Sequence, residues 1–237
     1  MADGGPRWQV CADTDGLAAA AAQRILAAAR AAIAARGDFH LVLAGGETPL
    51  PVYRLLAAAD AQWWGWHLYF GDERWLPAGH PGRNETAIRR AWLDRSPIPA
   101  MQIHPIAPQA SPEQAATCYR GVLRGVAQFD LVLLGLGADG HTASLFPGAS
   151  TGAEDVFAVR AAPGPFPVRI TLSPERLRRS RELVFVVAGA GKRAVLAAWR
   201  SGADLPAARV ARGHPEVLVM LDAAADPDCG GSRAETR

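Results

Sequence analysis

The sequence predicts an α/β fold, a single Rossmann-like domain with a mainly parallel sheet flanked by helices. Strand-like runs alternate with helix-like runs along the 237 residues, as in right-handed βαβ units. The clearest strands are apolar along their whole length, which is typical of strands covered on both faces. The length allows one large domain or two small ones, and no internal repeat or long linker divides the chain.

The strands are expected where short apolar runs end in glycine or in charged residues. The run DLVLLGLG, 130–137, is the most apolar of them, and WHLYFGDER, 66–74, is expected to run from a strand into a charged loop. In chain order, strands are expected at 7–11, 39–46, 66–74, 101–106, 130–137, 168–173, 182–189 and 216–221.

A long alanine-rich helix is expected at 17–36, where apolar residues recur at helical spacing. Thr14 or Asp15 can cap its start, and Gly37 stands just past its end. The segment also carries glutamine and arginine, and charged residues are costly inside a bilayer. We therefore expect a core-facing helix and not a membrane span.

The remaining helices follow the strands and begin at recognisable caps. Asn84 is a plausible cap for the third helix. Ser111 and Gln114 form a capping box around Pro112 in the fourth. After the alanine-rich helix, helices are expected at 49–59, 84–95, 111–128, from Ser173 onward, and at 192–200.

Composition excludes several classes of protein. A net charge of +2 is too small for nucleic acid to be the main partner. Three widely spaced cysteines without a C-x-x-C argue against a disulfide framework and a structural zinc site. No signal peptide is visible, so a cytoplasmic location is expected.

Residues 1–226 are expected to form the domain, and 227–237 a polar, poorly ordered tail. The basic run 176–181 is expected to be a solvated helix face.

Four strands end in turns rich in chemical groups. They are LVLAGGETP, LYFGDERW, LVLLGLGADGH and VFVVAGAGK. In open α/β sheets, ligands bind outside the carboxyl ends of the strands. If all four strands are parallel, their turns lie on one edge of the sheet and share one pocket. This convergence predicts a small-molecule active site.

The turn GLGADGH resembles a G-x-G-x-x-G dinucleotide fingerprint, but Pro147 and Gly148 end any helix too early to bind a pyrophosphate. His141 is therefore the residue of interest. An isolated histidine in a loop is usually held by a carboxylate or a carbonyl, here Asp139. In this context, a neutral imidazole is suited to taking a proton from water, and Asp139 can orient it. Ser144 lacks the G-x-S-x-G elbow of a nucleophile and is expected to make a cap or loop hydrogen bond.

The other turns offer possible anion contacts. The Gly45-Gly46 turn with Thr48 precedes a helix and can bind an anion, or it is an ordinary turn in which Thr48 caps the helix. Arg74 can hold a phosphate or an oxyanion, or belong to a surface ion-pair cluster. Arg169 and Lys192 are phosphate ligands only if their loops face the pocket. The histidines are scattered in sequence without metal-ligand spacing, so no metal site is expected.

These segments together resemble the 6-phosphogluconolactonases, in the wider group that includes glucosamine-6-phosphate deaminases. The matching pieces are LAGGETPLPVYRLL, FGDERWLP with Asn84, FDLVLLGLGADGHTASLFPG and RITLSPERLRRSRELVFVVAGAGKRAVL. The resemblance implies hydrolysis of 6-phosphoglucono-δ-lactone, in the oxidative pentose phosphate pathway, without a cofactor. It implies the following site: His141 as general base, Asp139 as its partner, Arg74 facing substrate, Gly45, Gly46, Thr48, Arg169 and Lys192 at the phosphate, and Asp72, Gly137 and Gly140 as further substrate contacts.

The sequence departs from this pattern near the expected phosphate. Ala44 and Glu47 stand where serines are usual, which removes two hydroxyl donors and adds a negative charge. Gly82 and Arg83 stand where an acidic residue and a serine are usual before the asparagine, and Arg83 is expected to be an extra anion contact. Glu47 is expected either to weaken phosphate binding or to pair with an arginine. DGHTASLFPG and DERW favour the lactonase branch over the deaminases.

Other functions stay open at this point. The alternatives are a deaminase-like sugar-phosphate isomerase, a non-catalytic phosphosugar-binding protein and a nucleotide-dependent oxidoreductase. The expected partner is a small phosphosugar lactone, with neither nucleic acid nor membrane, in a monomer or weak homo-oligomer. The sequence does not decide whether Arg74 or a backbone N–H of 137–140 stabilises the oxyanion.

Overall fold

A computed structural model describes residues 5–149 and 152–229. Its centre is a seven-stranded sheet in the order β1-β10-β9-β6-β2-β3-β5, with every strand pair parallel. The predicted α/β fold with a mainly parallel sheet is confirmed. The strands are β1 (Arg7–Cys11), β2 (Phe39–Leu43), β3 (Trp66–Phe70), β5 (Ile103–His104), β6 (Phe129–Leu134), β9 (Ser180–Val187) and β10 (Val217–Asp222).

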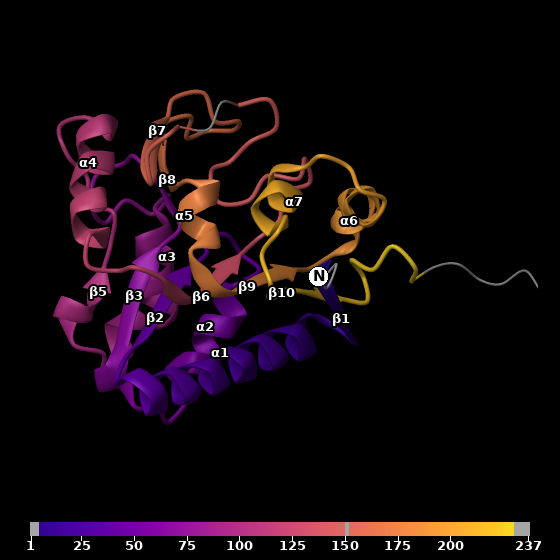
Figure 1. The fold of residues 1–237 in the computed structure, drawn as a ribbon, viewed down its shortest axis with the longest axis horizontal. Coiled ribbons are helices and arrows are strands. Elements are labelled where there is room, and N and C mark those ends of the chain that lie inside the picture. The colour runs from indigo at the N-terminus through magenta and orange to yellow at the C-terminus, as the bar shows by residue number, and fades with distance from the viewer. Residues whose placement is uncertain (1–4, 150–151, 230–237) are drawn as a thin grey trace, which may run out of the picture.

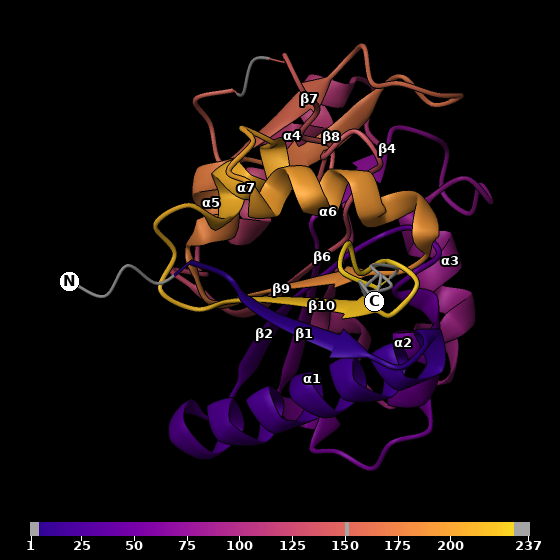
Figure 2. The same cartoon turned by 90° about the vertical axis from the view of Figure 1, so that its right-hand side faces the viewer.

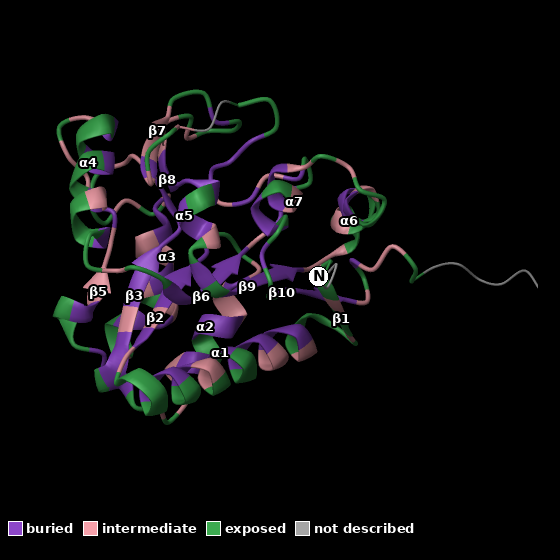
Figure 3. Ribbon diagram, viewed as in Figure 1, coloured by how far each residue is buried: buried purple, intermediate pink, exposed green. Residues whose placement is uncertain are grey.

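Helices cover both faces of this sheet (Figures 1 and 2). On one side lie α1 (Thr14–Arg36), α2 (Leu50–Ala57) and α3 (Asn84–Ala91). On the other lie α4 (Pro112–Leu123), α5 (Pro174–Arg178), α6 (Arg193–Arg200) and α7 (Pro206–Ala211). Short 3-10 turns occupy Trp63–Gly65, Leu93–Arg95, Ala100–Gln102 and Ala190–Lys192. The central strands are buried on both faces, which explains the unbroken apolar runs of β6 and β9. The outer surface of α1 is exposed (Figure 3).

Helix α1 packs its apolar stripe, from Leu17 to Ile33, against the sheet. By length and composition alone it could span a membrane, but here that stripe belongs to the protein core. Asp13 caps its start by accepting a hydrogen bond from the Gly16 N–H at 2.7 Å, so the expected caps Thr14 and Asp15 were wrong. Thr14 instead donates to Asp222 of β10.

A second, three-stranded antiparallel sheet stands above the first, in the order β4-β8-β7. It consists of β4 (Asp72–Arg74), β8 (Arg169–Leu172) and β7 (Val156–Val159). A charged loop was expected at 72–74, and no strand was predicted at 156–159. Both short segments are strands because they pair with β8, a contact between distant parts of the chain that local patterns do not reveal.

The predicted helices differ from the structure in further details. The fourth helix ends at Leu123, and tight turns carry the chain from there into β6. Helix α7 was not expected, although Pro206 stands in its first turn. Asn84 and Thr48 are not helix caps: Arg83 and Pro49 occupy those positions without side-chain cap bonds.

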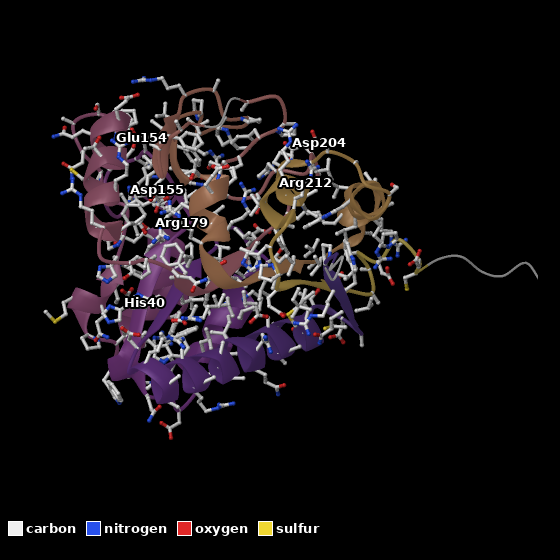
Figure 4. The ribbon with its side chains drawn as sticks, in the orientation of Figure 1. His40, Glu154, Asp155, Arg179, Asp204 and Arg212 are labelled. Carbon is white, nitrogen blue, oxygen red and sulfur yellow. The ribbon has the colours of Figure 1, made fainter. Side chains whose placement is uncertain are left out.

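The basic run 176–181 is not one solvated helix face, because α5 ends within it and β9 begins at Ser180. Arg176 is only 1% exposed. Its guanidinium lies 4.0 Å from the centre of the Phe129 ring and donates to the Val126 carbonyl. The neighbouring Arg179 pairs with Asp155 at the surface (Figure 4). The run therefore joins α5 to the sheet.

The predicted tail, 227–237, is described only as far as Cys229, and 230–237 lie outside the described residues. Arg200 of α6 forms ion pairs with Asp226 and Asp228, at 3.1 and 2.5 Å. Asp226 and Asp228 lie on either side of the expected domain boundary, so the ion pairs hold both sides of it to α6. The division at residue 226 stays a prediction.

Three histidines that are far apart in sequence meet on one face of β2, β3 and β5. The rings of His40 (labelled in Figure 4) and His67 stack with their centres 5.0 Å apart. His67 Nδ1 lies 3.5 Å from His104 Nε2, and His104 stacks on Tyr69. Among the described residues, no group of three histidines, cysteines or carboxylates is arranged to hold a metal ion. Burial, and then the neighbouring imidazoles, lowers the pKa of both His67 and His104.

This cluster predicts that the fold loses stability in mild acid. The folded-state pKa of His67 and His104 lies below the unfolded value of about 6.5, so the unfolded chain binds more protons as the pH falls below that value. The melting temperature should therefore fall between pH 7 and pH 5, and less steeply in His104→Phe, which keeps the ring but cannot titrate. Equal slopes in the wild type and the variant, measured by thermal unfolding, would contradict this account.

Candidate active site

A cavity of about 410 Å³ opens at the carboxyl ends of the parallel strands. It lies where the strand order reverses between β2 and β6, the position at which open α/β sheets bind ligands. The four turns expected to converge all contribute to its wall. The predicted site residues that line it are Gly45, Gly46, Thr48, Asp72, Arg74, Gly137, His141, Arg169 and Lys192.

The structure pairs His141 with Asp139. Asp139 Oδ1 lies 2.5 Å from His141 Nδ1 and also accepts the His141 backbone N–H at 3.1 Å. With Nδ1 protonated toward the carboxylate, Nε2 is the nitrogen left to accept a proton. Partial burial acts to raise the pKa of Asp139, but the hydrogen bonds from His141 outweigh it and hold that pKa below its usual value. Asp139 therefore orients the His141 ring and does not itself line the cavity.

Gly137 gives the His141 ring its space. A Cβ atom at Gly137 would lie 2.0 Å from His141 Nδ1 and 2.5 Å from Asp139 Oδ1, so no other residue fits beside this pair. The Gly137 N–H donates to the His141 carbonyl at 2.8 Å, which closes the loop. Gly140 lies behind the cavity, where its Cα faces Leu205.

Three cationic side chains face the cavity from different elements. Arg169 Nε donates to the Phe166 carbonyl at 3.1 Å, and Arg74 donates to the Gly82 carbonyl at 2.5 Å. Burial lowers the pKa of Lys192, while the charge of Asp139 acts in the opposite direction. Neutral carbonyl groups hold both arginines in place, and burial lowers the pKa of Arg169 while the nearby charge of Asp72 acts in the opposite direction. Because neither guanidinium forms a direct ion pair with a carboxylate among the described residues, both can bind an anionic ligand.

Two departures from the expected pattern have different outcomes. Arg83 does not reach the cavity: it is 1% exposed and donates to the Leu76 and Ile106 carbonyls and to Glu85. Its expected role as an anion contact was wrong. Glu47 does line the cavity, and within the described part of the chain no arginine pairs with it.

The three residues of the D-E-R segment have different roles. Glu73 is buried and its carboxylate accepts the backbone N–H groups of Asn84 and Glu85, at the start of α3. Burial raises the pKa of Glu73, against the opposing effects of Arg83 and these N–H groups. Glu73 is thus structural, whereas Asp72 and Arg74 on either side of it face the cavity.

Two residues near the cavity were assigned only local roles from sequence. Asn84, expected as a cap, lines the cavity and donates to Asp72. Ser144 makes the expected hydrogen bond, but with Asp72 of the distant β4. Their roles at the cavity could have been suspected from sequence, because both residues belong to the segments that match the family.

An α/β fold with a histidine–carboxylate pair and several cations around one cavity defines a class: small-molecule enzymes acting on anionic substrates. The family model described as glucosamine-6-phosphate isomerases/6-phosphogluconolactonase matches residues 12–219. The chain belongs to this family.

Individual relatives agree with this assignment. The chain is 39% identical to a 6-phosphogluconolactonase of Mycobacterium tuberculosis, over 90% of this chain and 94% of the relative. It is also 39% identical to one of Synechocystis, over 81% and 85%. The crystal structure of 6-phosphogluconolactonase from Thermotoga maritima superposes with a TM-score of 0.86 at 28% identity, over 92% of this chain and 100% of that chain.

The close approach at Gly137 predicts the effect of one added methyl group. Gly137→Ala should displace the His141 ring from Asp139 and lower kcat for the family reaction about 10²-fold or more. Gly121→Ala, in the exposed surface of α4, is the control, because a Cβ there also meets nothing within 4 Å and Gly121 does not line the cavity. Steady-state kinetics of both variants test this, and a Gly137→Ala enzyme with the kcat of Gly121→Ala would contradict it.

Proposed function

We propose that this chain hydrolyses 6-phospho-D-glucono-1,5-lactone to 6-phosphogluconate, in the oxidative pentose phosphate pathway. The observation that carries the proposal is the meeting of the His141–Asp139 pair with Arg74, Arg169 and Lys192 around one cavity. The 6-phosphogluconolactonases among its relatives support the same activity.

The substrate phosphate binds between the turn after β2 and the cations opposite it. Gly45, Gly46 and Thr48 offer backbone and hydroxyl donors, while Arg169 and Lys192 supply positive charge. Binding the phosphate here places the lactone ring toward the turn after β6, where His141 lies. The negative charge of Glu47 at the cavity wall weakens phosphate binding unless its side chain turns to solvent, where it is already exposed.

Hydrolysis then proceeds through general base catalysis. His141 Nε2 takes a proton from a water molecule, and its oxygen attacks the lactone carbonyl carbon. The imidazolium is stabilised by the Asp139 carboxylate. When the tetrahedral intermediate collapses, the bond from the carbonyl carbon to the ring oxygen breaks. The ring oxygen receives the proton from His141 and becomes a hydroxyl group, and the resulting carboxylic acid loses its proton to solvent to give the carboxylate.

The developing oxyanion needs a donor beside His141. Arg74 and the backbone N–H groups of 137–140 are the two candidates. The Gly137 and Gly140 N–H groups already donate to the His141 and Gly137 carbonyls, whereas Arg74 lines the cavity and forms no direct ion pair among the described residues. We therefore assign the oxyanion to Arg74.

Removing the base tests this mechanism. His141→Ala should lower kcat by about 10²–10⁴-fold and leave KM within a few-fold, because the imidazole acts on water and not on the phosphate. Lactone hydrolysis must be measured above the spontaneous opening of the lactone. A His141→Ala variant with near-normal kcat would overturn the assignment.

Removing one cation tests the phosphate site. Lys192→Ala should raise KM with a smaller effect on kcat, because it removes charge that binds substrate and transition state alike. Arg193→Ala is the matched control: it removes a neighbouring cation that is exposed and does not line the cavity. An unchanged KM in Lys192→Ala would exclude Lys192 from the phosphate site.

A further inference from the structure

The Asp72 carboxylate is a buried negative charge in the wall of a cavity built for an anion. It is 7% exposed, and both of its oxygens have partners. Ser144 Oγ donates to Oδ2 at 2.5 Å, and Asn84 Nδ2 donates to Oδ1 at 3.1 Å. Both donors are neutral, and the charge of Asp72 also acts on nearby Arg169, which forms no direct ion pair with it among the described residues. A phosphate would be repelled there, which raises the question of what this charge is for.

Ser144 reaches Asp72 because the chain takes an unusual conformation just before it. Ala143 has a φ of +48°, the one positive value among the described non-glycine residues. Such a conformation persists only where the surrounding structure determines it, and it clusters at ligand sites. The turn directs Ser144 from the His141 loop across to β4. The hydrogen bond thus ties the loop that carries His141 to the strand that carries Asp72.

Asn84 ties Asp72 to the third wall of the cavity. Its side chain packs so closely on the turn after β2 that a Cβ atom at Gly45 would lie 2.2 Å from Asn84 Oδ1. Its amide also donates to the Asp72 backbone carbonyl at 3.0 Å. The position of Asp72 is therefore set from both sides, by Ser144 on one loop and by Asn84 against another.

A carboxylate held in this way has a definite chemical use. Each of its oxygens can accept more than one hydrogen bond, and each receives one from a side chain here. The remaining lone pairs suit neutral O–H donors, and hydrogen bonds to a charged acceptor are the strong ones. A sugar lactone offers such donors in its ring hydroxyl groups.

We propose that Ser144 and Asn84 are positioning residues that hold Asp72 to accept a ring hydroxyl of the substrate, so that this network selects hydroxylated lactones. The inference rests on the proposed lactonase function, because it concerns the sugar ring of that substrate. It assigns the phosphate and the ring to different parts of the cavity: cations bind the phosphate, and a buried carboxylate binds the ring.

The test compares kcat/KM for 6-phosphogluconolactone with that for its 2-deoxy, 3-deoxy and 4-deoxy analogues. In the wild type, at least one analogue should be about 10–100-fold poorer, because a missing hydroxyl leaves the buried Asp72 without its partner. Ser144→Ala and Asp72→Asn should each reduce that ratio to about 3-fold or less. The double variant should lose little more than either single one, because both act on one contact.

Ser180→Ala is the matched control. Ser180 is also a buried serine, hydrogen-bonded to His214, but it stands at the amino end of β9, away from the cavity. This variant should keep the full selectivity ratio, which loss of a buried hydroxyl alone does not change. If Ser144→Ala does not fold, Asn84→Ala has the same expected ratio.

The outcomes separate the inference from the proposed function. A wild-type enzyme that hydrolyses all four lactones equally well overturns the role of Asp72 while the lactonase activity stands. Full selectivity in a folded Ser144→Ala or Asn84→Ala variant overturns the positioning roles. A wild type that does not accelerate hydrolysis of 6-phosphogluconolactone overturns the proposed function itself.

Discussion

Parallel pairing of β6 with β2 on one side and with β9 on the other determines where the polar residues of the cavity lie. Because the strands run in one direction, their carboxyl ends share an edge of the sheet. The strand order reverses between β2 and β6, so the segments that follow these two strands leave toward opposite faces and open a space between them. Short turns after β2, β3, β6 and β9 are then enough to surround a ligand.

Hydrogen-bond partners hold the charged side chains around that space in place. Backbone carbonyl groups hold Arg74 and Arg169, and neither guanidinium forms a direct ion pair with a carboxylate in the part of the chain that the structure describes. The negative charge of Asp139 faces His141, where a positive charge forms during proton transfer. Among the described residues, the hydrogen bonds to the Asp72 carboxylate come from neutral side chains, and its charge acts on Arg169. On the proposed function, the cavity offers positions for an anion, a proton acceptor and neutral hydroxyl groups.

Much of this could be predicted from sequence, for physical reasons. The long apolar runs of β6 and β9 and the stripe of α1 have strong periodicity, so the parallel sheet and its helices were predicted. The meeting of the four turns at one edge of the sheet could be predicted because the strands were expected to be parallel. Local patterns could not reveal β4 and β7, whose three and four residues form strands only through pairing with β8.

The contacts made by single side chains were harder to foresee. The Ser144–Asp72 bond joins residues 72 positions apart, and the His40, His67 and His104 cluster joins three strands. Arg83 was expected as an anion contact and Arg176 on a solvated helix face, yet both are buried with carbonyl groups as partners. Sequence spacing carries no information on such long-range pairs, because they depend on which strands become neighbours.

The central claim is that one cavity binds the phosphate and directs hydrolysis of the lactone attached to it. The most direct test is the initial rate of hydrolysis of 6-phosphogluconolactone and of unphosphorylated gluconolactone by the purified chain, each corrected for spontaneous opening. The account predicts strong acceleration for the phosphorylated lactone, with a kcat/KM at least about 100-fold above that for the unphosphorylated one. Decay of the phosphorylated lactone no faster than in buffer, or equal kcat/KM for both lactones, would contradict it.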